Sequence, residues 1–306
     1  MCEIELWAYT VRMKFYDTPL WRPPSEGQNL ILQATLGCSF NGCTFCSMYK
    51  SKRYVARPLD DVFTDIETAA KEDENVRRVF LADGDALALP TDEMGLILDR
   101  LAATFSGLQR VTCYATPQNL NKKSVEDLRL LNDKRLKMVY FGLESGSQDI
   151  LKRIHKGSPQ AMERALAKAN QAGLKVSATV ILGLGGSVHW RDHIAQTANL
   201  INRQPPRFLS TLQLGLDEDV EGEFLTAFKK GGDAFQWQDD EGILEELERL
   251  LETLNPPRPI IFRSNHASNC LPLAGTLPKD TPRLLAEVRA AKADLKSLRP
   301  NHLRGF

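Results

Sequence analysis

The sequence predicts an α/β fold with a parallel sheet built from successive strand-helix units. From residue 29 to about residue 214, short apolar runs alternate with amphipathic helical patterns, which is typical of such a sheet. The helical patterns also begin at residues that favour helix starts, as in Ser158-Pro159. The chain has 306 residues, 42% hydrophobic and 25% charged, so it is large enough to bury a full core.

Six apolar runs are long enough for strands and are separated by helix-length segments. The expected strands are residues 29–35, 76–82, 108–115, 136–143, 174–182 and 207–214. Helices with apolar residues at i, i+3 and i+4 are expected to begin at Thr91, Ser124 and Ser158. Gly173 stands where a glycine commonly ends a helix.

The pattern divides the chain into three parts. We expect a leader over 1–28, a core over 29–214 and an extension over 215–306 that covers the core. Met13 is an alternative start of the chain. Within the extension, residues 217–240 are expected to form an acidic loop and residues 241–254 an amphipathic helix. Residues 257–278 are expected to be irregular and punctuated by Pro and Gly, and residues 283–298 to form a second helix.

The charge balance and the hydropathy of the chain limit which binding partners and which cellular location we expect. Lys+Arg and Asp+Glu are 39 each, so no global field attracts nucleic acid, and a nucleic-acid partner is not favoured. No run of about 18 apolar residues predicts a membrane span. Glu3 and Glu5 lie where a secretory signal would be basic. We therefore expect a cytoplasmic protein, in which clustered cysteines form a metal or redox site rather than disulfides.

Three of the six cysteines lie within "GCSFNGCTFC", residues 37–46, directly after the first expected strand. Cys38, Cys43 and Cys46 have the spacing C-x4-C-x2-C. One interpretation is a plant-type [2Fe-2S] centre, which uses this spacing and a distant fourth cysteine. The candidates for that fourth ligand are Cys113, inside an expected strand, and Cys270 in the extension.

Two further interpretations remain for this motif. A structural zinc site needs four ligands; of the histidines, only His189 and His193 have helical i, i+4 spacing. The third interpretation is a [4Fe-4S] cluster held by three thiolates, with one iron left open. Open coordination is the mark of a catalytic metal site, and the carboxyl ends of parallel strands are where such sites gather.

The cysteine motif resembles that of the radical S-adenosylmethionine (SAM) superfamily, most closely the group with tRNA methylthiotransferases and oxygen-independent coproporphyrinogen oxidases. An aromatic residue, Phe45, precedes the last cysteine, as it does in that superfamily. The spacing is one residue longer than the usual C-x3-C-x2-C. The resemblance covers about residues 29–214 and implies a partial (βα)6 TIM-like barrel with parallel strands and an irregular plus helical C-terminal extension. It also implies that Cys38, Cys43 and Cys46 ligate a [4Fe-4S] cluster.

Three other segments carry the resemblance, each at the end of an expected strand. "FGLESGSQD" matches a family segment that contacts SAM, which implies this role for Glu144 and Ser145. "LADGDALALP" stands where the family has Gly-Gly-Glu-Pro and implies that the SAM amino group meets the stretch from Asp83 through Gly84 to Asp85. "TVILGLGG" implies a backbone approach to adenine or ribose at Ile181 and Gly183, although Thr179 and Gly186 depart from the family pattern. Taken alone, these segments are also typical of helix caps and glycine turns.

The resemblance implies that SAM is cleaved reductively to a 5′-deoxyadenosyl radical, which abstracts hydrogen from the substrate in a site closed to water and oxygen. An electron donor such as flavodoxin or ferredoxin is then needed. The sequence has no second C-x2-C pair, and we expect no added module beside the core. We therefore expect a small-molecule substrate and an oxidation, cleavage or rearrangement rather than a group transfer.

The extension contributes a dense polar run, "IIFRSNHASNC", residues 260–270. Asn265 and His266 are expected on the substrate side, where the histidine would act as an acid, a base or a hydrogen-bond donor. A solvated loop is the alternative for this run. Two other functions remain open: a radical SAM enzyme that modifies tRNA or a nucleobase, and a non-catalytic iron-sulfur electron carrier or sensor.

Overall fold

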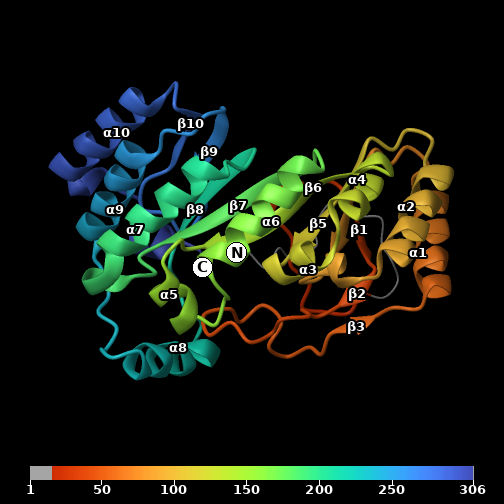
Figure 1. Ribbon diagram of the computed structural model, residues 1–306, viewed down its shortest axis with the longest axis horizontal. Coiled ribbons are helices and arrows are strands. Elements are labelled where there is room, and N and C mark those ends of the chain that lie inside the picture. The colour runs from red at the N-terminus through yellow and green to blue at the C-terminus, as the bar shows by residue number, and fades with distance from the viewer. Residues whose placement is uncertain (1–15, 306) are drawn as a thin grey trace.

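The computed structural model describes residues 16–305 and is organised around one twisted sheet (Figure 1). The sheet has eight strands in the order β1-β4-β5-β6-β7-β8-β9-β10, and β2 and β3 form a separate pair. The strands are β1 Leu30–Gln33, β2 Thr35–Leu36, β3 Val55–Ala56, β4 Arg78–Ala82, β5 Arg110–Ala115, β6 Leu136–Glu144, β7 Lys175–Leu182, β8 Phe208–Gln213, β9 Ile260–Ser264 and β10 Leu273–Leu277.

The six strands expected from the sequence are confirmed as β1, β4, β5, β6, β7 and β8, and neighbours pair in parallel. Their side chains alternate between two faces. Leu32, Leu81 and Val139 belong to the large core beneath the helices, whereas Ile31 and Phe80 pack on the opposite face. The carboxyl ends of all six strands therefore lie on one edge of the sheet, which is the edge where α/β enzymes place their active sites.

Most helices, from α1 to α10, cover one side of this sheet in a row, whereas α8 lies apart from that row (Figure 1). Neighbouring pairs are α1 with α2, α2 with α4, α4 with α6, α7 with α9, and α9 with α10. Their bounds are α1 Leu59–Glu72, α2 Thr91–Thr104, α3 Pro117–Lys122, α4 Val125–Asp133, α5 Gln148–Arg153, α6 Pro159–Gln171, α7 Gly186–Arg203, α8 Glu218–Lys230, α9 Asp240–Thr253 and α10 Thr281–Ala293.

The helix starts follow the expected capping chemistry. The Ser124 hydroxyl accepts the Asp127 N–H in a capping box, and the Ser158 hydroxyl accepts the Ala161 N–H. Gly173 ends α6 with a φ of +70°, a conformation that glycine adopts without strain. The alternative start at Met13 lies outside the described residues.

The extension differs from its expected form at two places. The segment expected to be irregular contains β9, which pairs in parallel with β8, and β10, which pairs antiparallel with β9. Prolines before β9 and after β10 and a glycine within β10 concealed both strands in the sequence. Gly275 brings β10 against α10, because a Cβ there would lie only 3.0 Å from Leu284 Cδ1.

The segment expected to be an acidic loop contains helix α8. Its acidic residues lie in the first turn, where they interact favourably with the helix dipole. Val220, Phe224 and Phe228 recur every four residues and form its buried face. The high charge of this stretch concealed that period.

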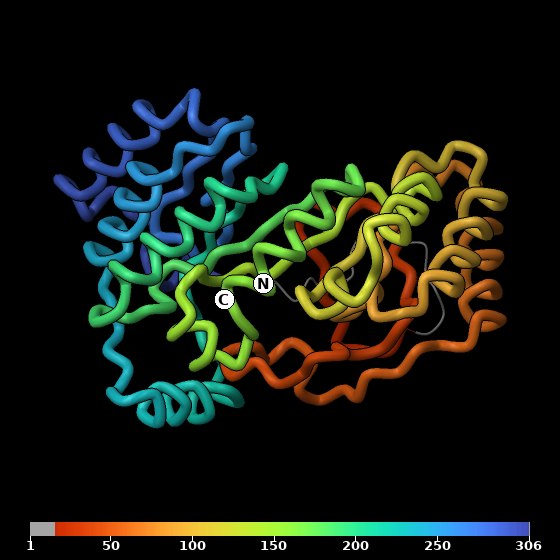
Figure 2. The backbone as a smooth tube through the Cα atoms, viewed as in Figure 1, coloured from red at the N-terminus to blue at the C-terminus, as the bar shows by residue number. Residues whose placement is uncertain are grey.

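A long loop leaves the sheet after β1 and returns at β3, and it contains the three clustered cysteines. The antiparallel pair β2–β3 joins the two ends of the loop, with Thr35 opposite Ala56. Figure 2 shows this loop, in orange, running beside α5 and α8. None of the helices described over residues 16–305 is long and apolar enough to cross a membrane.

The pairing of β9 with β8 predicts that the extension unfolds together with the core. Phe262 is fully buried in β9, so we expect Phe262→Ala to lower the free energy of unfolding by roughly 3–5 kcal/mol in a single transition. Urea denaturation followed by circular dichroism measures this change. Arg263→Ala, at the exposed neighbouring position, is the control and should change stability little. A separate early transition in Phe262→Ala would mean that the extension folds independently.

Candidate active site

The cysteine loop is fastened to the sheet at both of its ends by one carboxylate. Asp83, just after β4, accepts hydrogen bonds from Gly37 N at 2.8 Å and from Lys52 Nζ at 3.2 Å. Gln33 Nε2 also donates to Asp83, at 3.2 Å. Gly37 precedes the first cysteine and Lys52 follows the last, so Asp83 holds the loop against the ends of two strands. The resemblance implied that Asp83 meets the SAM amino group; this role stays a prediction, and the carboxylate makes these three hydrogen bonds within the protein.

The centre of the loop rests on α5. Thr44, between the second and third cysteines, donates its N–H to Ile154 O at 3.3 Å. Cys43 is buried, and Cys38 and Cys46 are partly buried. The three thiols therefore lie at the carboxyl edge of the sheet, between the end of β1 and the C-terminal end of α5.

Burial makes this environment unfavourable for thiolates that have no compensating charge. It raises the pKa of Cys38 to about 12 and also raises the pKa values of Cys43 and Cys46. Lys156 is the cation that lowers all three. A metal centre deprotonates coordinating thiols outright and is the natural partner of three thiols in such surroundings.

Lys156 lies within a compact group of charged and aromatic side chains. Its Nζ is 3.3 Å from Glu144 Oε1 and 5.8 Å from the centre of the Phe45 ring. Gly142 makes room for this pair, because a Cβ at that position would lie 2.0 Å from Glu144 Oε1 and 2.9 Å from Lys156 Nζ. The structure thus brings Phe45 and Glu144 to the cysteines. The sequence analysis did not single out Lys156, because nothing in the sequence distinguished it from a surface lysine.

Asp85 enters from the end of β4 and is held by the cysteine loop and by β5. Its Oδ2 accepts hydrogen bonds from the Ser39 hydroxyl, from Asn119 Nδ2 and, at 3.2 Å, from the Thr116 hydroxyl. Its Oδ1 is buried and has no hydrogen-bond partner among the described residues. A buried acceptor without a partner fits a positively charged group of a bound cofactor.

Ser145 and Ile181 are joined by a residue that the sequence analysis considered only as a zinc ligand. His193 Nδ1 is 2.8 Å from the Ser145 hydroxyl, and its Nε2 is 3.0 Å from Ile181 O. Burial lowers the pKa of His193 to about 4, so the ring is neutral. Nε2–H then donates to Ile181 O, and Nδ1 accepts the Ser145 hydroxyl. His189, one turn earlier, pairs instead with Asp233.

Gly183 is held by a residue of the extension that sequence reasoning missed. Glu246 of α9 is fully buried, and its Oε2 accepts the Gly183 N–H at 2.8 Å. Burial raises the pKa of Glu246 to about 8, against the opposing effect of this hydrogen bond. No sequence signal marks Glu246, because its helix contains several other glutamates. The extension thus contacts the β7 loop directly.

Asn265 and His266 stand apart from this group. They follow β9, and five strands lie between β9 and β1 in the sheet. His266 Nδ1 accepts the Ser268 N–H at 3.2 Å, and its main-chain oxygen accepts Arg299 Nη1 at 2.9 Å. The first contact is local and the second comes from Arg299, near the C-terminal end of the described residues. A substrate role for Asn265 and His266 stays a prediction.

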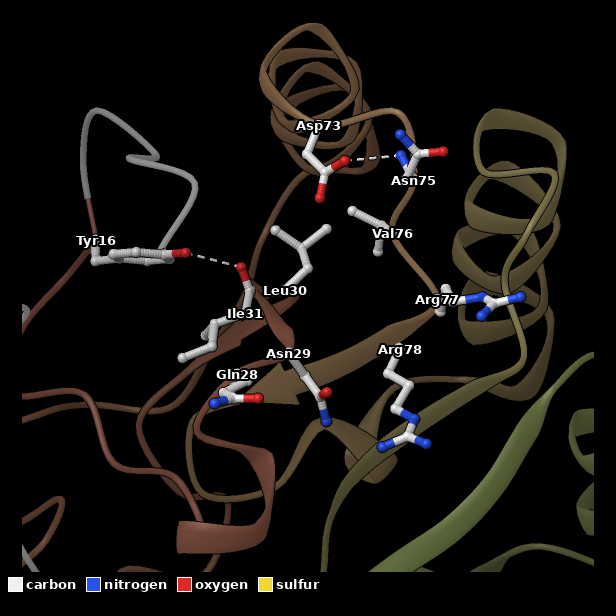
Figure 3. A pocket seen from close by; sticks show the side chains of 10 residues that line it. All are labelled: Tyr16, Gln28, Asn29, Leu30, Ile31, Asp73, Asn75, Val76, Arg77 and Arg78. Atoms are coloured by element: carbon white, nitrogen blue, oxygen red, sulfur yellow. Dashed lines mark hydrogen bonds between the residues drawn. The ribbon is translucent and has the colours of Figure 1, made fainter. Parts of the chain in front are cut away.

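A polar cavity of about 240 Å³ lies at the opposite edge of the sheet (Figure 3). It is lined by residues at the amino ends of β1 and β4, including Asn29 and Arg78, and by Tyr16. Tyr16 donates its hydroxyl to Ile31 O at 2.9 Å across this cavity. Its position separates it from the cysteine loop, so it takes no part in the candidate site.

The arrangement of the potential ligand side chains suits an iron-sulfur cluster better than a single metal ion. Over residues 16–305, no three His, Cys, Asp or Glu side chains converge closely enough to hold one metal ion. A cluster spreads its thiolates over different irons and so does not require them to meet at one point. Three buried or partly buried thiols, the largely buried cation of Lys156 and an unpaired carboxylate oxygen together define an iron-sulfur enzyme site on a partial parallel barrel.

The chain belongs to the radical SAM superfamily, whose sequence model matches residues 32–201. Its cofactors are accordingly a [4Fe-4S] cluster and SAM. This confirms the resemblance read from the sequence. It also replaces the alternatives of a [2Fe-2S] centre, a zinc site and a non-catalytic electron carrier.

Individual relatives agree with this assignment. A tRNA-2-methylthio-N(6)-dimethylallyladenosine synthase from Actinobacillus succinogenes is 25% identical over 239 residues, which are 74% of this chain and 47% of the relative. The chain thus spans about half the length of that curated relative. Coproporphyrinogen III oxidase (HemN) from Escherichia coli has a TM-score of 0.54 at 13% identity, over 73% of this chain and 51% of that one.

A methyltransferase, TsrM from Kitasatospora setae, solved with cobalamin and a [4Fe-4S] cluster bound, has a TM-score of 0.50 at 17% identity. The match covers 61% of this chain and 34% of that chain. These two structural likenesses support the fold class alone.

Gly84 sets the close approach of the β4 loop to the cysteine loop. A Cβ there would lie 2.6 Å from Cys38 Cβ and 2.9 Å from two Tyr49 ring atoms. We expect Gly84→Ala to cost about 1–3 kcal/mol of stability and to reduce the iron bound per chain after anaerobic reconstitution. Gly222→Ala, where a Cβ meets nothing within 4 Å, is the control. Undiminished iron in Gly84→Ala would contradict this packing.

Glu246 predicts a pH dependence of stability. The folded protein keeps the proton of Glu246 to about pH 8, whereas the unfolded chain releases it near the ordinary pKa of 4.5. The folded state therefore binds more protons between these values, and the free energy of unfolding should fall as the pH rises from about 5 to 8. Urea denaturation at several pH values should give a flatter profile for Glu246→Gln. Parallel profiles for the two proteins would contradict the assignment.

Proposed function

We propose that this radical SAM enzyme abstracts hydrogen from a small-molecule substrate, leading to oxidation, bond cleavage or rearrangement. When bound, the reduced cluster and SAM supply the radical chemistry. The proposal assigns Cys38, Cys43 and Cys46 to the cluster. Asp85 would take the SAM ammonium group through its unpaired oxygen, and the chain as a whole would position and shield the cofactor.

The remaining contacts of SAM would come from groups that are already fixed. Ser145 and Ile181 are both held by the neutral His193 ring. Gly183 is held by Glu246, and Phe45 packs against the core beside the cysteines. Because these groups are already held in place, little conformational entropy is lost when SAM binds. The Glu144 carboxylate would interact with both Lys156 and the cofactor.

The negative charge beside the cysteine loop is the observation that supports the proposed substrate class. Five of the seven residues over 217–223 are acidic. Asp217 accepts the Ser47 hydroxyl, and Glu223 Oε2 lies 3.0 Å from Lys50 Nζ. The start of α8 thus places negative charge directly on the cysteine loop. A polyanion such as RNA is repelled by such a surface, whereas a small neutral or cationic molecule is not.

A tRNA substrate is the second candidate. The names of the curated relatives favour it, since the relative from Actinobacillus succinogenes is a tRNA-modifying synthase. That relative is about twice as long as the matched region, so its substrate is not carried over with the shared part. Retention on tRNA that falls steeply between 50 and 200 mM salt would favour this candidate, because phosphate contacts release counterions.

The cluster and SAM assignments predict the outcome of a single-turnover experiment. The reconstituted, reduced protein should form 5′-deoxyadenosine from SAM, and Cys43→Ala should form about a hundredth as much or less. Chromatography of the quenched reaction measures the product. Cys113→Ala is the matched control, because that cysteine is buried in β5 away from the loop, and it should retain activity. Equal product from Cys43→Ala and the wild type would contradict the ligand assignment.

A small-molecule substrate should then increase 5′-deoxyadenosine formation when metabolite fractions are added, in the absence of RNA. Dependence of the product on added tRNA alone would overturn the substrate class while leaving the cluster assignment intact.

A further inference from the structure

The hydroxyl of Tyr49 has no partner among the described residues of the protein. Tyr49 follows the last clustered cysteine by three residues, and only 3% of its surface is exposed. Its hydroxyl oxygen is buried and makes no hydrogen bond with any residue over 16–305. Buried hydroxyls are almost always paired, because leaving one unpaired costs free energy. A hydroxyl left unpaired at this depth needs an acceptor that the described residues do not supply, such as a bound ligand.

The position of the ring places this hydroxyl at the cofactor site. Gly84 lies between Cys38 and Tyr49, since a Cβ on Gly84 would meet both Cys38 Cβ and the Tyr49 ring at under 3 Å. The main-chain oxygen of Tyr49 accepts the Lys52 N–H at 3.0 Å and Asn41 Nδ2. The backbone is thus held by the cysteine loop itself, which fixes where the ring points.

The ionisable groups that affect the Tyr49 hydroxyl lie at or near the candidate active site. Burial raises its pKa, and Tyr114, Asp83, Cys46 and Cys38 raise it further. The hydroxyl therefore keeps its proton and is available as a donor. None of these four neighbours accepts a hydrogen bond from it.

A second unpaired atom belongs to Asp85, the residue that follows Gly84. Asp85 Oδ1 is buried and lacks a donor among the described residues, whereas the Tyr49 hydroxyl lacks an acceptor. The two unpaired groups have opposite needs, and a bound group that carries both a cation and an anion would satisfy them. An α-amino acid moiety has that chemistry, and so has a cationic group beside an anionic cluster.

We propose that Tyr49 is a cofactor-binding residue whose hydroxyl donates a hydrogen bond to an anionic acceptor on the bound cofactors. The two sources of such an acceptor are the carboxylate of SAM and a sulfur of the cluster. Asp85, the residue after Gly84, takes the cationic partner. This inference rests on the placement of the cluster and SAM beside the cysteine loop and not on the choice of substrate.

The test is Tyr49→Phe, which removes the hydroxyl and leaves the ring. Tyr140→Phe is the matched control: its hydroxyl hydrogen-bonds Glu26, on the other side of the ring cluster that includes Phe80 and Tyr114. Three quantities are measured on each protein. They are the thermal stability without cofactors, the dissociation constant of SAM from the reconstituted protein by equilibrium dialysis, and the midpoint potential of the SAM-free cluster by EPR-monitored titration.

The expected pattern separates a cofactor ligand from a structural tyrosine. Without cofactors, Tyr49→Phe should be as stable as the wild type or more stable, whereas Tyr140→Phe should lose stability. With cofactors, Tyr49→Phe should weaken SAM binding about tenfold or more if the acceptor is the carboxylate. If the acceptor is a cluster sulfur, the midpoint potential should fall, because hydrogen bonds to the sulfurs help set that potential.

Either of the last two results supports the proposal and identifies the acceptor. Unchanged SAM binding together with an unchanged potential would overturn it. A loss of cofactor-free stability in Tyr49→Phe equal to that in Tyr140→Phe would also overturn it, since the hydroxyl would then have a partner within the protein. The success or failure of substrate turnover does not enter these readouts, so the substrate proposal is tested separately.

Discussion

The Asp83 carboxylate holds the candidate site together. It accepts hydrogen bonds from Gly37 and Lys52, at the two ends of the cysteine loop, and from Gln33 at the end of β1. Burial alone raises the pKa of Asp83, and these donors act in the opposite direction. Asp83 adopts a φ of +63°, uncommon for a residue other than glycine. The position of the three cysteines therefore depends on the hydrogen bonds of this one buried carboxylate.

A small number of residues also balances the charges of the candidate site. Three thiols, Glu144 and Asp85 would place much negative charge in a buried region, and Lys156 is the buried cation that offsets it. The pair formed by Lys156 and Glu144 requires the bare backbone of Gly142. On the other side, His193 and Glu246 hold the β7 loop through hydrogen bonds to its main chain. The chain thus fixes its motifs through residues that lie outside them.

The sequence predicted the sheet because its strands are largely buried and therefore read as apolar runs. It also predicted the cysteine loop, because three thiols within nine residues of a polar segment indicate a metal site. It did not predict β9, β10 or α8, whose local signals are masked by prolines, glycine and acidic residues. Nor did it single out Lys156, His193 or Glu246. Their roles come from burial and partners far along the chain, such as Ile181 for His193, and single-residue chemistry does not encode those.

The central claim is that Cys38, Cys43 and Cys46 hold a [4Fe-4S] cluster with one iron open to SAM. The most direct measurement is the EPR spectrum of the anaerobically reconstituted, reduced protein, recorded before and after SAM is added. The claim predicts about four irons per chain and a reduced-cluster spectrum that changes when SAM coordinates the open iron. Bound zinc in place of iron, or a cluster spectrum that SAM leaves unchanged, would contradict it.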